Sequence, residues 1–157
     1  MEIDIRTLVI ILGFTHLMQV LVFYHQFKVN KTYRGIGWWL LWGAAEVIGF
    51  GCILLRGIPS LLPTIIIVQN LTIVAGTVFL YIGIRRFFDK TANLKIMLPI
   101  AMTFTAGLLF FLFVNNNIQV RSVFISATLA IISFITAYSL FTDKPKSINA
   151  AANFNAC

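Results

Sequence analysis

The sequence predicts an all-α integral membrane protein with about five transmembrane helices, and three observations support this fold class. Of the 157 residues, 59% are apolar and only 11% are charged, and the mean hydropathy is +0.92. A soluble domain of this length needs about a quarter of its residues charged to cover its surface. Five apolar stretches are long enough to span a membrane, and the basic residues collect in alternate connections between them.

Each of the five stretches has the length that a bilayer requires. Crossing the roughly 30 Å hydrocarbon core takes about 20 apolar residues, and these must be helical because lipid offers no hydrogen bonds to the backbone. The expected spans are 7–27, 37–55, 61–84, 96–114 and 120–141. We expect the first span to be retained, because Glu2 and Asp4 precede it and it lacks the small-residue cleavage site of a signal peptide.

Polar or turn-forming segments separate the spans. They are the basic loop 28–34, the Arg-Gly-Ile-Pro-Ser segment 56–60, the basic loop 85–95 and the Asn-rich segment 115–119. Connections this short make sequential helices antiparallel neighbours. We therefore expect residues 1–141 to form one transmembrane helical domain. Residues 142–157 are expected to form a polar tail, with a truncated connection to a further helix as the alternative.

The distribution of Lys and Arg predicts the orientation, because cytoplasmic loops carry the excess of basic residues. Only Arg6, Arg56 and Arg121 fall on one side, and the other nine fall on the opposite side. The N-terminus is therefore expected outside and the C-terminus in the cytoplasm. Three indoles open the second span on its cytoplasmic side, at positions Trp38, Trp39 and Trp42. We interpret them as anchors at the headgroup level, with a ligand-stacking box as the alternative.

Polar residues near the middle of a span are the candidate functional residues. Glu46 is the one carboxylate inside a predicted span and lies at its middle, where lipid tolerates it only with a partner or in its neutral form. The groups at similar depth are His16 and Gln19 on the first span and Gln69 and Asn70 on the third. We expect these five residues to form a polar cluster, either a ligand or proton site or a set of interhelical hydrogen bonds.

Other classes of function find no support in the motifs. The sequence contains no GxSxG, HExxH or phosphate-binding loop and no pair of close carboxylates, so we expect no catalytic residues and no cofactor. His16 and His25 are about 13 Å apart along one helix, too far to share a metal ion. Nucleic acid is not an expected partner, because the basic residues flank apolar spans and suit lipid headgroups.

The order of features from Trp38 to Lys90 resembles the N-terminal multi-helix membrane sensor region of bacterial diguanylate cyclases (GGDEF proteins) and sensor histidine kinases. The shared features are Trp-Gly at 42–43, Leu-Leu-Arg-Gly at 54–57, Ile-Pro at 58–59, a central Asn at 70, Tyr-Ile-Gly at 81–83 and Arg-Arg-Phe at 85–87. They cover about a third of the chain. The resemblance implies a region that passes a signal to a cytoplasmic module, with any cyclase or kinase activity outside this chain.

Three hypotheses for the function follow. The first is a sensory input module in the bacterial inner membrane, whose partners would be the lipid bilayer, a cytoplasmic signalling domain of the same or a partner chain and, as the resemblance implies, a second copy in a homodimer. The second is a small proton-coupled transporter in which Glu46 and His16 relay a proton. The third is a structural membrane subunit, which would tolerate replacement of Glu46.

Overall fold

The computed structural model describes residues 5–30 and 34–143. The elements are α1 (Ile5–Val29), α2 (Ile36–Leu54), the 3₁₀ turns η1 (Leu55–Gly57) and η2 (Pro59–Leu61), α3 (Leu62–Phe87), α4 (Leu94–Phe113) and α5 (Ile118–Asp143). All five α-helices are long and apolar enough to cross a membrane, which confirms the predicted fold class at that level. Residues 144–157 of the predicted polar tail lie outside the described part of the chain.

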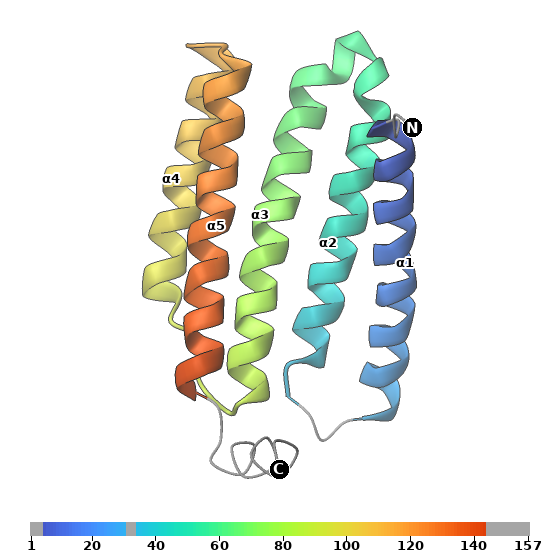
Figure 1. Ribbon diagram of the computed structural model, residues 1–157, viewed down its shortest axis with the longest axis vertical. Helices are drawn as coiled ribbons and strands as arrows, with labels where there is room; N and C mark the ends of the chain where they lie inside the picture. The colour runs from blue at the N-terminus through green and yellow to red at the C-terminus, as the bar shows by residue number, and fades with distance from the viewer. Residues whose placement is uncertain (1–4, 31–33, 144–157) are drawn as a thin grey trace, which may run out of the picture.

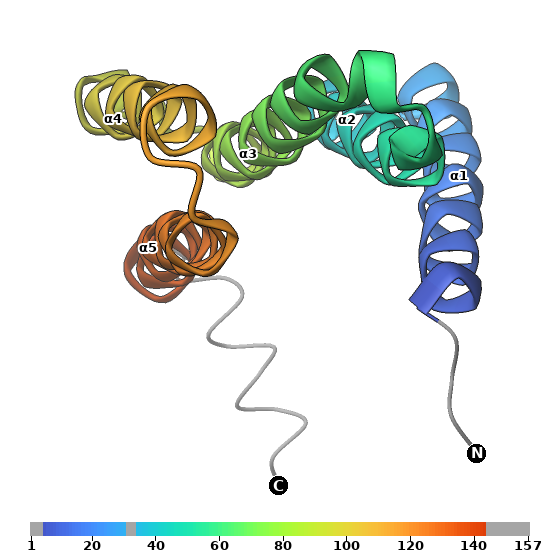
Figure 2. The ribbon, with the colours of Figure 1, turned by 90° about the horizontal axis from the view of Figure 1, so that it is seen from above.

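The five helices stand side by side and alternate in direction along the chain (Figure 1). Viewed from above, α2 lies between α1 and α3, and α4 and α5 pack together against α3 (Figure 2). Their ends fall within three residues of the spans expected from the sequence. The main local difference is at the second break, where two 3₁₀ turns carry the chain from α2 into α3 and Pro59 occupies the first position of η2.

Apolar side chains lie both in the interior of the bundle and around its outside. A buried core joins α3, α4 and α5 and consists of Val74, Tyr81, Ile82, Met97, Phe104, Leu108 and Ile132. The perimeter is also apolar, since side chains such as Phe134 and Met102 are 79% and 71% exposed. Isolated hydrophobic residues are common on soluble proteins, but a continuous apolar perimeter is typical of a surface covered by another apolar phase. Lipid contact around the bundle is therefore expected.

The contact between α2 and α3 is the most extensive in the bundle, and small residues line it. At Gly49, a Cβ atom would lie 2.7 Å from Cγ1 of Ile73, and at Gly83 it would overlap the indole of Trp39. Gly35 has a φ of 118°, which favours glycine, and its backbone packs against the Gly83 carbonyl. Small residues of this kind let two helix backbones approach closely, which increases their van der Waals contact. We call this line of contacts the α2–α3 seam.

A pair of glycine substitutions tests the seam. Gly83→Ala should lower the free energy of unfolding by about 1–3 kcal/mol, because the new methyl group must displace Trp39. Gly51→Ala is the matched control in α2, where no atom lies within 4 Å of the added Cβ, and it should raise stability by about 0.5–1 kcal/mol. The measurement is unfolding in mixed detergent micelles, followed by circular dichroism. Equal effects at the two sites would contradict the close contact.

Candidate functional site

Glu46 lies on α2 and faces α3 at the middle of the seam. Its side chain is 7% exposed, and a Cβ atom placed on Gly76 would lie 3.2 Å from its Oε1. The indole of Trp42, one turn earlier on α2, forms a hydrogen bond with the Glu46 carboxyl group. The absence of a side chain at Gly76 therefore makes the space that the carboxyl group occupies. The carboxyl group of Glu46 therefore lies directly between the backbones of α2 and α3.

His16 reaches the same place from α1. Its ring stacks on Phe50 with a centroid distance of 5.3 Å and meets the edge of Trp42 at 6.0 Å. Its Nδ1 atom is buried and has no hydrogen-bond partner within the described part of the chain. Trp42 therefore touches His16 with its ring and Glu46 with its N–H group. We call these three residues the His16–Trp42–Glu46 cluster.

The two predicted amides of α3 are buried but point to other partners. Asn70 Nδ2 donates to the carbonyl of Ile66 at 2.7 Å, and Gln69 Oε1 accepts a hydrogen bond from Arg56 Nε at 3.0 Å. Asn70 precedes Gly76 by six residues, which is about 9 Å along the helix axis. The polar residues of the third span are therefore separated from Glu46. Gln19 is half-buried on α1.

The three tryptophans lie between helices near one end of the bundle. Trp38 packs against Phe79 with a centroid distance of 5.8 Å, and Trp39 packs against Phe87 at 5.3 Å. Their role as interface anchors stays a prediction. The contribution of Trp42 to the cluster was missed by the sequence analysis. The spacing of Trp42 and Glu46 is i, i+4, which places them on one helix face and was the available signal.

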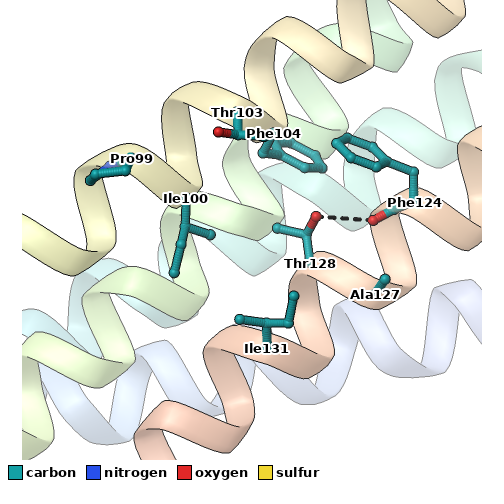
Figure 3. Close-up of a pocket in the computed structure, with 8 residues that line it drawn as sticks. All are labelled: Pro99, Ile100, Thr103, Phe104, Phe124, Ala127, Thr128 and Ile131. Atoms are coloured by element: carbon teal, nitrogen blue, oxygen red, sulfur yellow. Dashed lines mark hydrogen bonds between the residues drawn. The ribbon is translucent and has the colours of Figure 1, made fainter.

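A pocket lies between α4 and α5, away from the cluster (Figure 3). Its volume is about 280 Å³, and the stacked rings of Phe104 and Phe124 form part of its wall. The hydroxyl of Thr128 donates to the Phe124 carbonyl at 2.9 Å, so its hydrogen is used within α5. This pocket suits an apolar group such as an acyl chain. The His16–Trp42–Glu46 cluster has a buried carboxyl group and an imidazole nitrogen that no described residue pairs with, so it is the better candidate for a functional site.

Comparison of the chain with protein-family models, with curated protein sequences and with solved structures gives no match.

A double-mutant cycle tests whether Trp42 and Glu46 interact. Trp42→Phe removes the indole N–H but keeps an aromatic ring beside His16, and Glu46→Leu removes the acceptor. The two changes should be coupled by about 0.5–1.5 kcal/mol in the free energy of unfolding. Trp38→Phe is the matched control, because Trp38 packs on Phe79, and its coupling to Glu46→Leu should be near zero. Equal coupling energies in the two cycles would show that Trp42 has no specific interaction with Glu46.

Proposed function

We propose that this chain is the membrane-embedded sensory input module of a bacterial signalling protein in the inner membrane. In this proposal, a stimulus at the His16–Trp42–Glu46 cluster changes the packing of α2 on α3, and the change passes to a cytoplasmic output domain outside the chain. The observation that carries the proposal is the position of a buried carboxyl group inside the most extensive helix contact of the bundle. A hydrogen-bonding amide would hold two helices together without the risk of ionisation.

The first step of the proposed mechanism occurs at the seam. Glu46 occupies the space left by Gly76, and Trp42 packs beside both residues. Binding of a ligand, or a change in the hydrogen bonds of His16 or Glu46, alters how closely α2 and α3 can approach. Packed helix contacts respond to such a change by shifting between discrete arrangements, typically by about 1–2 Å.

The second step carries this shift to the end of α3. Trp39 lies one turn before Trp42 and contacts both Gly83 and Phe87, in the last two turns of α3. Arg85 then ties the following loop to the helix, because its Nε and Nη2 atoms donate to the Thr91 carbonyl at 3.1 and 2.9 Å. A displacement of α3 therefore moves the loop that the basic residues assign to the cytoplasm. This loop is the surface through which we propose the signal leaves.

Distance measurements between spin labels test this mechanism. With Cys52 and Cys157 replaced, labels at Lys28 and Lys90 report on the end of the bundle where the proposed signal emerges. We expect Glu46→Gln, which changes the ionisable group with little change in shape, to shift the distance distribution by about 1–2 Å or to change its populations. Thr128→Val is the matched control, since Thr128 is a buried polar residue on α5 away from the seam. If Glu46→Gln gives the same distance distribution as the parent protein, or the same shift as Thr128→Val, the proposal is refuted.

Proton flux separates this proposal from the transport hypothesis. In liposomes with a pH gradient and an internal pH dye, the parent protein should give no flux above that of protein-free vesicles. Flux that Glu46→Gln abolishes would assign the cluster to a proton relay. Full tolerance of both Glu46→Gln and Glu46→Leu, in stability and in label distances, would instead favour a structural subunit.

A further inference from the structure

Another pocket lies at the opposite end of the bundle from Trp39, beside the α2–α3 and α4–α5 connections. These connections are at the top of Figure 1. The pocket has a volume of about 240 Å³ and lies between the start of α3, the end of α4 and the start of α5. Five of the residues that line it are Ile66, Phe113, Asn116, Ile118 and Arg121. All but Asn116 and Arg121 present apolar side chains, so the pocket joins an apolar wall to a guanidinium group.

The guanidinium of Arg121 has a donor that no described residue satisfies. Its Nη1 atom is buried and has no hydrogen-bond partner within the residues that the structure describes. A buried donor without an acceptor is unfavourable, and more so when the donor is charged. A ligand oxygen in the pocket would remove this cost. Asn116, on the same wall, adds an amide that both donates and accepts hydrogen bonds.

The surroundings of Arg121 add positive potential. Arg56 is near enough for its charge to interact unfavourably with that of Arg121, and its Nε atom donates to Gln69. The N-terminal ends of α3 and α5, which carry partial positive charge, also lie at this end. Among the acidic residues with described side chains, Glu46 lies mid-bundle and Asp89 at the other end. Among the described residues, this end of the bundle therefore has positive charge suited to an anion but no acidic side chain to balance it.

The depth of Arg121 indicates the source of the anion. A helix of the length of α5, with 26 residues, is about 39 Å long. A bilayer has a hydrocarbon core of roughly 30 Å, so about 4–5 Å at each end would lie among the headgroups. Arg121 is three residues into α5, about 4.5 Å along the axis. Its guanidinium therefore lies at the boundary between the apolar core and the lipid phosphates.

We propose that this pocket binds an anionic phospholipid, with the phosphate on Arg121 and the first part of an acyl chain against Ile66, Phe113 and Ile118. The planar guanidinium matches the oxygen geometry of phosphate and donates two parallel hydrogen bonds to it. A net negative lipid is favoured over a zwitterionic one because two arginines at this end lack a described counter-charge. This site is independent of the sensory proposal, since it is far from Glu46 along the helix axes.

Lipid titration of the full chain in detergent, read by native mass spectrometry, tests the site. The probes are phosphatidylglycerol and phosphatidylcholine with identical acyl chains. The parent protein should bind phosphatidylglycerol about tenfold more tightly, and Arg121→Gln should remove about tenfold of that affinity. Arg86→Gln is the matched control, because Arg86 is an exposed arginine at the opposite end and its replacement removes the same charge. It should leave the preference intact.

Further variants and probes keep the test decisive. Arg121→Lys retains the charge but loses the planar guanidinium, and Arg56→Gln removes only the neighbouring charge. The affinity of both variants for phosphatidylglycerol should therefore lie between those of the parent protein and Arg121→Gln. Both variants should keep the helix content of the parent protein. Equal losses from Arg86→Gln and Arg121→Gln would overturn the proposal in favour of general electrostatic attraction. Competition by inorganic phosphate alone would assign a free-anion site, and equal competition by oleate would assign a carboxylate site; either result overturns the phospholipid.

Discussion

The close approach of α2 and α3 is the interaction on which the rest of the structure depends. Gly49, Gly76 and Gly83 allow the two helices to touch along most of their length. Ile73 of α3 fills the space beside Gly49, and side chains of α2 fill the spaces beside Gly76 and Gly83. The helix α1 packs on the other side of α2, and the α4–α5 pair packs on α3. Each remaining helix is therefore positioned by reference to this seam.

The physical basis of the seam differs from that of a soluble core. Lipid tails are as apolar as leucine side chains, so burial of apolar area gives little drive for helices to associate in a bilayer. Close van der Waals contact and a few hydrogen bonds must hold them together instead. Glu46 combines both, since its carboxyl group fits beside Gly76 and pairs with Trp42. A residue that is costly to bury thus becomes part of the contact that stabilises the fold.

The fold was largely predictable from the sequence, whereas the candidate site was predictable only in part. Span length and the spacing of loops determine where membrane helices begin and end, because the thickness of a bilayer is nearly constant. Depth along a span does not determine which way a helix is rotated. Gln69 and Glu46 lie at similar depth in the sequence, yet Gln69 bonds Arg56 in the connection between α2 and α3. Only helix rotation and register, which hydropathy does not encode, separate those two groups.

The placement of the three tryptophans has an experimental consequence. The sequence contains no others, and all three lie in the first two turns of α2, on contacts with α1 and α3. The tryptophan fluorescence of the protein therefore originates from one end of α2, where the indoles contact both α1 and α3. Its emission and its quenching by neighbouring groups form a built-in optical reporter of how α2 sits on its neighbours, one that needs no label and is insensitive to the end of the bundle where Arg121 lies.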